Sequence, residues 1–496
     1  MATLLDVLAH GAAADPALVV PGGPTFTYAQ LRDAVEAAAQ RFAELGLGPG
    51  DRIATVYGNG PEAVIFFLAA AAAGTAAPLN PAYKEEEFRF YLEDTQARAL
   101  VVPPGQAEAA RAARPEAVIL IEASIRPDGS LDISSQAPRR SASANRPDED
   151  AVALVLHTSG TTSRPKCVPL RHRHLAASVE NIVPTYALTP EDASLCVMPL
   201  FHVHGLMAST LSSFRSGGAV IVPPKFNPMA FWPVVKEHRA TWYSAVPTMH
   251  QMLLMRSSGK RPDGAEALRF IRSCSSALPP AVQSDLEASF GAPVLNAYGM
   301  TEASHQMASN PLPPDPRLPG TVGRGTGVEV GVVDEDWRQL APGAQGEVVV
   351  RGPNLTDGYD RNPAANEASF RGGWFRTGDQ GVLDEAGYLT LVGRLKEMIN
   401  RGGEKIAPGE IDDVLLQHPA VAEAVAFGVP HPTWGEEVAA AVVLKGEATA
   451  KELAAHARER LADFKVPKTI HIVAEIPRTA TGKIQRRNVA AQFTDK

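Results

Sequence analysis

The chain has 496 residues, of which 45% are hydrophobic and 21% charged, a composition that indicates a globular protein and excludes a disordered or fibrous one. At this length we expect more than one domain, because single cores rarely grow beyond about 250–300 residues. A net charge of −8 and a pI near 5.9 argue against a general nucleic-acid binder, so any polyanionic ligand must be held by local cations.

Localisation signals are lacking in the places where they usually occur. The N-terminus has no basic segment before an apolar run, and the C-terminus shows neither a prenylation box nor a peroxisomal signal. The apolar stretch Phe66–Pro78 is shorter than the roughly 20 residues of a membrane span, and we read it as one buried helix. Three widely spaced cysteines, Cys167, Cys196 and Cys274, indicate a reducing compartment. We therefore expect a cytoplasmic protein with no membrane partner.

The first 150 residues mix helical patterns with short strands. Tyr28–Glu44 has apolar residues at helical spacing, whereas Arg52–Tyr57 and Leu100–Pro103 have the composition of strands. The segment Ser134–Asp150, which is rich in Ser, Pro, Arg and Asp, is predicted to be a solvated connection.

From residue 151 to about 330, predicted strands alternate with predicted helices. The expected strands are Ala151–Leu156, Ser194–Met198, Ala219–Val222, Trp242–Ala245, Phe270–Cys274 and Val294–Tyr298, and the expected helices are Arg171–Val179, Phe231–Arg239 and Pro280–Phe290. Such alternation predicts βαβ units whose loops gather at the C-terminal ends of the strands, where ligands usually bind. Nearly all the candidate chemistry lies in four such loops: Thr158–Lys166, Pro199–Gly205, Ser275–Leu278 and Gly299–Glu302.

The last third of the chain changes character twice. Between 320 and 393, Gly and Pro punctuate short strands such as Glu329–Val333, Gly346–Val350 and Tyr388–Val392, which predicts a small β-rich subdomain. Beyond Arg394 the α/β pattern returns. Helices are expected at Ile411–Leu416 and Lys451–Phe464, and strands at Val421–Val429, Val438–Leu444 and Thr469–Val473.

The loop Thr158–Lys166 is the most informative stretch of the sequence. Its hydroxyl side chains, its glycine and its lysine can aim N–H groups, O–H groups and a point charge at phosphate oxygens. It is not a Walker loop, because Pro165 precedes Lys166 and Cys167 follows it. Taken alone, an ordinary Ser/Thr turn remains the alternative.

This loop resembles the phosphate-binding loop of the acyl-adenylate-forming superfamily, which includes acyl-CoA synthetases, luciferases and peptide-synthetase adenylation domains. Further stretches that resemble motifs of the superfamily follow in order: Tyr298–Glu302, Trp374–Asp379, Arg394–Lys405 and Pro477–Lys483. Ser163 and Cys167 stand where the superfamily usually has glycine. A serine at position 163 resembles the loop of the oxalate–CoA ligase branch, whereas a cysteine at position 167 differs even from that branch. Cys167 would be strained if its position required a positive φ.

The resemblance implies a multidomain α/β fold, and it supplies domain boundaries that composition alone does not reveal. A large N-terminal domain, residues 1–393, would contain stacked βαβ subdomains and the small β-rich subdomain. Residues 394–396 would form a hinge, and residues 397–496 a small, mobile α+β domain. Lys396 falls on the hinge position of the superfamily.

The resemblance also implies the nucleotide site. ATP or AMP would be contacted by Thr158, Ser159, Gly160, Thr161, Thr162, Lys166, Ser276, Ala277, Tyr298, Gly299, Thr301, Asp379 and Arg394. Glu302 would hold Mg²⁺, which prefers carboxylate oxygens, and Asp379 would accept hydrogen bonds from the ribose hydroxyls. Without the resemblance, Glu302 reads as a solvated strand-end residue and Asp379 as a turn residue.

Catalysis and thiol binding are assigned to the last hundred residues by the same resemblance. Lys483 would deliver an ammonium group to the α-phosphorus of ATP, where it stabilises the charge that builds up in the transition state. Gly402 and Gly403 would let the backbone approach the pantetheine arm of coenzyme A. Taken alone, Lys483 reads as an exposed loop lysine, and the glycine pair as a turn.

In the superfamily the acid pocket lies between the strand-end loops, so the resemblance implies that it contains His202, Ser275 and His305. Histidines and serines suit a short anionic acid better than a fatty acid, and a second buried carboxylate would need donors or a positive partner. Ser275 and His305 resemble pocket positions of the oxalate–CoA ligase branch, although His305 could equally be a structural core histidine.

We therefore expect a carboxylate–CoA ligase that uses ATP, Mg²⁺ and coenzyme A, with His202, Lys396 and Lys483 in catalytic roles and oxalate as the favoured acid. Three alternatives stay open: a ligase for other short or longer acids, an enzyme that loads a carrier protein, and a nucleotide-binding regulator without catalysis. The sequence leaves the oligomeric state open.

Overall fold

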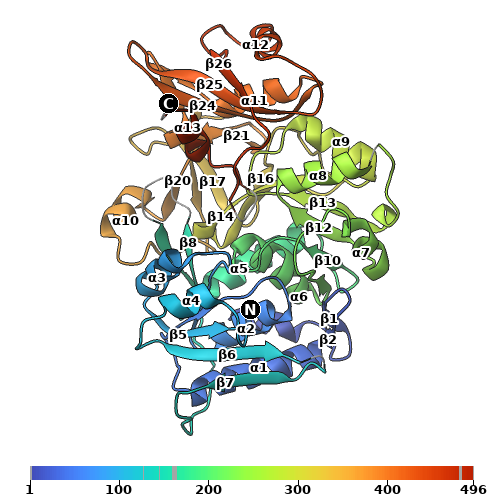
Figure 1. The fold of residues 1–496 in the computed structure, drawn as a ribbon, viewed down its shortest axis with the longest axis vertical. Helices are drawn as coiled ribbons and strands as arrows, with labels where there is room; N and C mark the ends of the chain where they lie inside the picture. The colour runs from blue at the N-terminus through green and yellow to red at the C-terminus, as the bar shows by residue number, and fades with distance from the viewer. Residues whose placement is uncertain are drawn as a thin grey trace.

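The computed structural model describes residues 3–126, 128–144, 146–158, 165–257, 259–479 and 483–494. Ser159, Gly160, Thr161 and Thr162 of the predicted phosphate loop, and Ser163 with them, lie outside these residues. Figure 1 shows a large α/β domain, coloured blue to yellow, with a smaller α/β domain in orange and red at one end. The predicted α/β class is therefore confirmed.

The described strands form four sheets, and the first of them lies in the N-terminal part of the chain. Its order is β7-β6-β5-β3-β4-β8-β9, with β9 antiparallel to β8. The strands are β3 (Arg52–Thr55), β4 (Thr75–Pro78), β5 (Ala97–Val102), β6 (Ile119–Ile125), β7 (Leu131–Ser135), β8 (Val152–Thr158) and β9 (Lys166–Arg171). The helices of this part are α1 (Tyr28–Glu44), α2 (Pro61–Ala73), α3 (Glu85–Asp94) and α4 (Glu108–Ala113).

The second sheet carries most of the candidate loops, and its order is β16-β15-β14-β13-β12-β10-β11-β1-β2. The strands are β1 (Pro16–Val19), β2 (Thr25–Thr27), β10 (Ala193–Cys196), β11 (Ala219–Ile221), β12 (Trp242–Ala245), β13 (Phe270–Ser273), β14 (Val294–Met300), β15 (His305–Ser309) and β16 (Arg324–Gly325). Strands β10 to β14 run parallel, so their C-terminal ends meet at one edge of the sheet.

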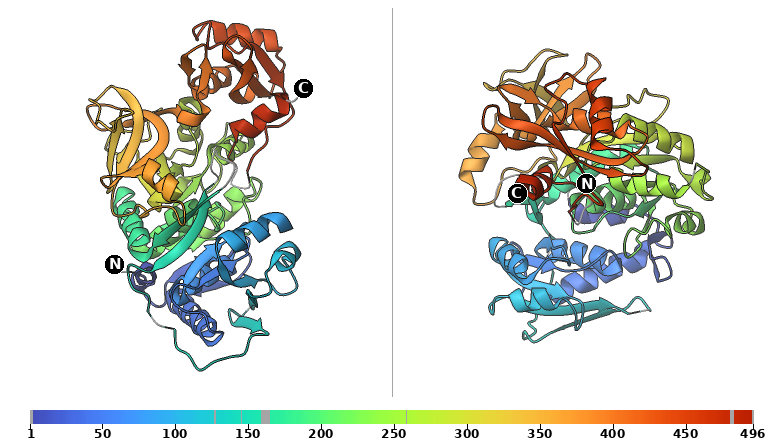
Figure 2. Two further views of the ribbon diagram at one scale, coloured as in Figure 1. Left: turned by 90° about the vertical axis from the view of Figure 1, so that its left-hand side faces the viewer. Right: turned by 45° about the horizontal axis from the view of Figure 1, so that its top comes forward.

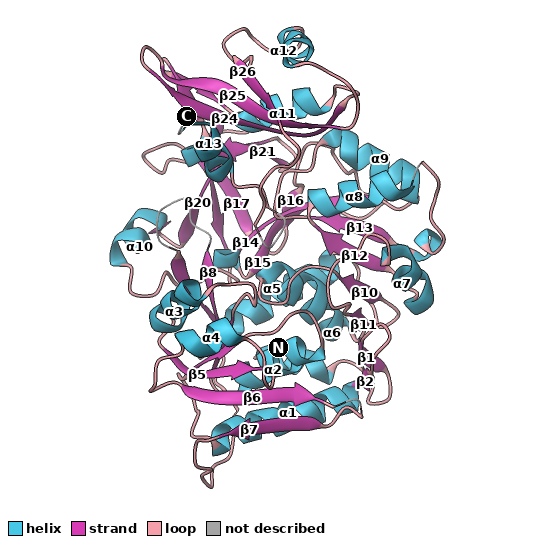
Figure 3. Ribbon diagram, viewed as in Figure 1, coloured by secondary structure: helices cyan, strands magenta, loops and turns pink. Residues whose placement is uncertain are grey.

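Helices cover this second sheet. They are α5 (His172–Thr185), α6 (Ser212–Ser216), α7 (Phe231–His238), α8 (Pro247–Ser257) and α9 (Pro280–Phe290). Figure 3 shows α7, α8 and α9 beside β12 and β13, and their apolar side chains share one buried cluster with those strands. A π-helical segment, His204–Leu211, begins inside the expected loop Pro199–Gly205.

The β-rich subdomain and the smaller domain each have a sheet of their own. The former contains β17 (Glu329–Val333), β18 (Gln345–Arg351), β19 (Phe370–Arg371), β20 (Trp374–Leu383) and β21 (Leu389–Arg394), with helix α10 (Pro363–Ser369). The latter contains β22 (Ile399–Arg401), β23 (Glu404–Ile406), β24 (Val421–His431), β25 (Gly435–Leu444) and β26 (Thr469–Ile472), with helices α11 (Pro408–Leu416), α12 (Ala450–Arg458) and α13 (Arg486–Thr494). The two further views in Figure 2 keep this smaller domain at one end of the molecule.

Three expected elements need correction. Phe66–Pro78 is not one helix: α2 ends at Ala73 and β4 follows, because a Cβ on Gly74 would lie 2.4 Å from the carbonyl oxygen of Asp51. Lys166–Arg171 is strand β9 rather than the end of a loop. The helix expected at Lys451–Phe464 ends at Arg458, although Leu461 and Phe464 beyond it still pack on the same core.

None of the described helices is long and apolar enough to cross a membrane, which agrees with the interpretation of the alanine-rich helix α2 as a core element.

Candidate active site

Two predicted pocket residues, Ser275 and His305, contact His204 where the parallel strands of the second sheet end. Ser275 follows β13, and its Oγ lies 3.0 Å from Nδ1 of His204. His305 begins β15, and its ring stacks on the ring of His204 with the ring centroids 5.1 Å apart. Ser275 and His305 both adopt positive φ, +75° and +104°, which is uncommon for residues with a side chain and often occurs at functional sites.

His202 lies in the same pocket, but one of its nitrogens is unpaired. Its Nδ1 is buried and has no hydrogen-bond partner among the described residues. Burial, with a smaller contribution from the nearby charge of Lys483, lowers the pKa of His202 to about 3. His202 is therefore neutral at physiological pH and has a polar atom available for a ligand.

Lys166 and Glu302 lie close together in a second part of the candidate active site, which we call the centre. Lys166 pairs with Thr158 across β8 and β9, and its Nζ lies 4.2 Å from the centroid of the Tyr359 ring. The Tyr359 hydroxyl donates a 2.8 Å hydrogen bond to Oε1 of Glu302. Burial lowers the pKa of Lys166 and raises that of Glu302, while each group opposes the shift of the other. The phosphate-loop lysine and the candidate metal ligand thus share one environment.

Asp379 already has two partners. The Tyr298 hydroxyl donates to one of its oxygens, and Nε of Arg394 lies 3.1 Å from the other. The Asp379 side chain is only 9% exposed. These contacts connect the end of β14 with the β20–β21 hairpin and fix the position of the Asp379 carboxylate.

Lys483 reaches this centre from the smaller domain. Burial lowers the pKa of Lys483, and the charge of Arg394 lowers it further, while Asp379 and Glu302 oppose the shift. Its charge also acts on His202 and His305. Its backbone N–H donates to Oγ1 of Thr479 at 3.1 Å.

The remaining predicted residues divide into two groups. Ser276 and Ala277 are exposed beside Ser275, and Thr301 is buried next to Glu302. Gly299 touches the pocket, because a Cβ there would lie 2.1 Å from the carbonyl oxygen of His305. In contrast, Gly402 and Gly403 form the β22–β23 turn at φ of +60° and +96°, and Gly402 N donates to the carbonyl oxygen of Trp434 within their own domain.

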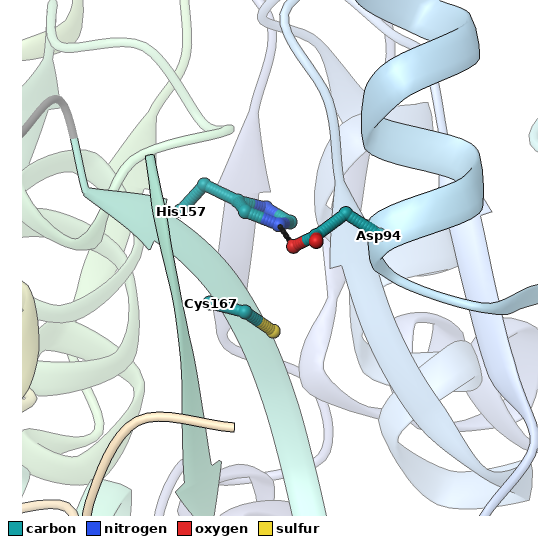
Figure 4. A group of neighbouring side chains, drawn as sticks. All are labelled: Asp94, His157 and Cys167. Atoms are coloured by element: carbon teal, nitrogen blue, oxygen red, sulfur yellow. Dashed lines mark hydrogen bonds and ion pairs between the residues drawn. The ribbon is translucent and has the colours of Figure 1, made fainter. Parts of the chain in front are cut away.

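Cys167 lies beside the centre in a polar cluster with Asp94 and His157 (Figure 4). It is extended in β9 opposite His157 and has no positive φ, so the strain anticipated from its place in the sequence is absent. His157 Nε2 lies 2.9 Å from Oδ2 of Asp94. The charges of Arg52 and Arg361 as well as that of Asp94 act on both His157 and Cys167, and the contact between His157 and Asp94 connects α3 with the β8–β9 hairpin.

Sequence reasoning missed three residues of the centre: His204, Arg272 and Tyr359. His204 could have been found from its spacing, since it lies two residues after His202 in a loop at the C-terminal end of a strand. Arg272 could have been found as a charged residue inside a predicted buried strand, a position that requires a partner. Nothing in the local sequence marks Tyr359, which arrives from a loop more than fifty residues after Glu302.

This geometry, a strand-end centre that a lysine of a second domain reaches, defines an α/β enzyme with a site between two domains. The chain belongs to the AMP-binding enzyme family: the family model matches residues 6–360, and the model of the AMP-binding enzyme C-terminal domain matches residues 410–483.

Individual relatives support this placement. The chain is 49% identical over 494 residues to the oxalate–CoA ligase of Arabidopsis thaliana, covering 97% of this chain and 96% of that protein. It is 30% identical to ATP-bound MatB from Rhodopseudomonas palustris with a TM-score of 0.90, and the same MatB without ligand gives 0.77. Both comparisons cover 100% of this chain and 99% of the MatB chain. The described arrangement is thus more similar to the ATP-bound form.

Proposed function

We propose that this family member is an ATP-dependent carboxylate–CoA ligase that activates oxalate as an acyl-AMP and transfers it to coenzyme A. The observation that carries the proposal is the position of Lys483, whose charge acts on both the histidine pocket and the pair Asp379 and Glu302. Likeness to an oxalate–CoA ligase over nearly the whole chain supports the choice of acid.

In the first half-reaction, a carboxylate oxygen of the acid attacks the α-phosphorus of ATP and pyrophosphate leaves. Thr158, Lys166 and the loop between them would bind the phosphates, and Asp379 with Arg394 would hold the ribose. Lys483 would stabilise charge that develops on the transferring group more strongly than charge in the ground state. Tyr298, Gly299 and Thr301, together with Ser276 and Ala277, would line the nucleotide.

Glu302 fits the role of a magnesium ligand. Its carboxylate is buried, one oxygen is held by Tyr359, and the residue shares its environment with the phosphate-loop lysine. Mg²⁺ binds one or two carboxylates together with substrate phosphates, and when bound it would neutralise charge on the phosphate oxygens.

The second half-reaction would require the smaller domain to move. We assign residues 1–393 to the larger domain, 394–396 to the hinge and 397–496 to the smaller domain, with Lys396 as the pivot. Rotation would remove Lys483 from the centre and bring the Gly402–Gly403 turn to it, so that the thiol of coenzyme A attacks the acyl-AMP and AMP leaves.

The test is AMP release from a panel of acids with ATP and Mg²⁺, with and without coenzyme A. Oxalate should give the highest kcat/KM, ahead of malonate, glycolate, acetate, hexanoate and cinnamate, and an oxalyl thioester should form only with coenzyme A. Adenylation of oxalate without thioester formation would instead indicate a carrier protein as the acceptor. Absence of pyrophosphate release with every acid would indicate a regulator, and a clear preference for another acid would refute the choice of oxalate.

A further inference from the structure

The pocket contains a buried positive charge that the protein does not neutralise. Arg272 on β13 has 0% exposure. Its guanidinium donates to Tyr186 Oη at 2.8 Å, Ser244 Oγ at 2.9 Å, Gln306 Oε1 at 3.0 Å, His305 Nε2 at 3.0 Å and His204 Nε2 at 3.4 Å. All five acceptors are neutral, and no carboxylate among the described residues forms an ion pair with Arg272.

Such an arrangement is costly for the free protein. A buried charge without a counter-ion loses its hydration, and neutral hydrogen bonds together with the nearby ring of Tyr186 return only part of that loss. The surrounding side chains are arranged around the guanidinium, so it is a permanent part of the pocket wall. A negatively charged ligand in the pocket would supply the missing opposite charge.

Arg272 also determines where His305 carries its proton. A guanidinium only donates hydrogen bonds, so Nε2 of His305, 3.0 Å away, must act as an acceptor. The ring of His305 is then neutral with its proton on Nδ1, which agrees with a pKa well below the usual value because of burial and neighbouring positive charges. Nε2 of His204 lies closer to Ser244 Oγ, at 2.6 Å, than to Arg272, and its Nδ1 lies 3.0 Å from Ser275 Oγ. The arginine therefore makes the imidazole of His305 a donor on the side away from itself.

We propose that Arg272 is the positioning residue that makes this pocket select a doubly charged acid over a singly charged one. One carboxylate of the acid reacts at the α-phosphorus. The second carboxylate receives the Nδ1–H group of His305 beside Ser275, and the charge of Arg272 behind the rings of His204 and His305 balances its negative charge. This inference rests on the proposed function, since it assumes that the acid binds beside His202.

The experiment compares Arg272→Met and Arg272→Lys with the wild type and with Arg256→Met, which removes an exposed arginine on α8 as a matched control. Arg272→Met should lower kcat/KM for oxalate by roughly 10²-fold, mainly through KM, and change the value for acetate only a few-fold, because one buried counter-charge is lost. Arg272→Lys should recover part of the preference for oxalate, and the KM for ATP should stay unchanged in both. An oxalate-to-acetate ratio within about twofold of wild type in folded Arg272→Met would overturn the proposal.

A second measurement needs no variant and covers the case in which Arg272→Met does not fold. Calorimetric binding of oxalate and of oxamate, its monoanionic amide of the same shape, is compared in wild-type protein with ATP analogue present. Oxalate should bind at least about 10-fold more tightly, and equal affinity would refute the selection of a dianion. If the wild type binds oxalate in preference to oxamate but forms no acyl-AMP, the proposed function fails while this inference stands.

Discussion

In the proposed mechanism the adenylation chemistry depends on Lys483, and the environment of this residue fits that role. Burial and Arg394 lower its pKa, whereas Asp379 and Glu302 oppose that shift, so phosphate oxygens entering the centre would add to its stabilisation as a cation. Interactions that the ammonium forms only with the ligand contribute to the transition state rather than to the fold.

We predict that Lys483→Ala reduces acid-dependent exchange of pyrophosphate into ATP by roughly 10²–10³-fold, the usual effect of removing one preorganised donor. The thermal unfolding temperature should change little. Lys451→Ala, an exposed lysine of α12 in the same domain, is the matched control and should keep full exchange. Near-normal exchange in Lys483→Ala would remove this residue from the mechanism.

Sequence reasoning identified most of the centre at the scale of single residues, but it could not find those that act through others. His202, Ser275 and His305 were predicted from the resemblance of their loops to the acid pocket of the superfamily. Arg272 was missed because its proposed role depends on its contacts, which are distant in the sequence. Its partners lie at the C-terminal end of α5, on β12 and β15, and at the start of the π-helical segment.

At the scale of elements, the β14–β15 hairpin positions most of the site. Tyr298 and Gly299 lie before its turn and Glu302 within it, and His305 starts the returning strand. The register shifts between Tyr298 and Gly299, and the bulge brings the His305 carbonyl against Gly299. Bulges next to active sites re-aim side chains, and this one orients His305 toward Arg272.

Replacing Gly299 with alanine should therefore disrupt the hairpin, since the new Cβ would lie 2.1 Å from the His305 carbonyl oxygen. We expect a loss of stability of about 2 kcal/mol or more and loss of adenylation, measured by denaturant unfolding and by pyrophosphate exchange. Gly409→Ala in α11, where a Cβ would meet nothing within 4 Å, should be neutral or slightly stabilising. Equal behaviour of the two variants would contradict this account.

Elements with a strong local pattern were predicted well, and the failures have physical causes. The helix at Tyr28–Glu44 has the predicted bounds, because its apolar residues are correctly spaced and Thr27 caps its first turn. Strand β9 was missed because Lys166 was taken as the end of a loop and a helix was expected from Arg171, whereas β9 is an edge strand that tolerates Pro169. The strand β4 was missed because only the approach of Asp51 to Gly74 interrupts the alanine-rich run.

The proposed mechanism divides the whole molecule into two domains whose relative position would decide which loop reaches the active site. Lys396 lies in a 3₁₀ turn directly after β21, next to Arg394, which contacts Asp379. A residue there can influence domain movement without taking part in adenylation.

We predict that Lys396→Pro spares adenylation and abolishes thioester formation, because proline fixes φ at the pivot and restricts rotation. The two half-reactions are measured separately, as pyrophosphate exchange and as transfer of preformed oxalyl-AMP to coenzyme A. Equal loss in both assays would argue against domain rotation about this residue.

Buried neutral histidines make the stability of the whole fold dependent on pH. Burial lowers the pKa of His172, His174 and His250 to about 4 each, against 6.5 for an exposed histidine. Below pH 6.5 the unfolded chain takes up protons that the folded chain refuses, so the free energy of unfolding falls as the pH drops toward 4.

Denaturant unfolding at pH 7.5 and pH 5 should show this loss, on the order of 1 kcal/mol for each histidine. His250→Gln, which cannot be protonated in this range, should reduce the difference between the two pH values. An unfolding midpoint that is unchanged between pH 7.5 and pH 5 would mean that these rings are protonated inside the fold.

The placement of Lys166 and Glu302 on different sheets has one more consequence. Lys166 begins β9 of the first sheet, whereas Glu302 follows β14 of the second, and Tyr359 from a third segment lies between them. A nucleotide bound to both residues would link the two sheets of the larger domain. Nucleotide binding should then raise the thermal unfolding temperature of the protein, even when no acid is present and no reaction takes place.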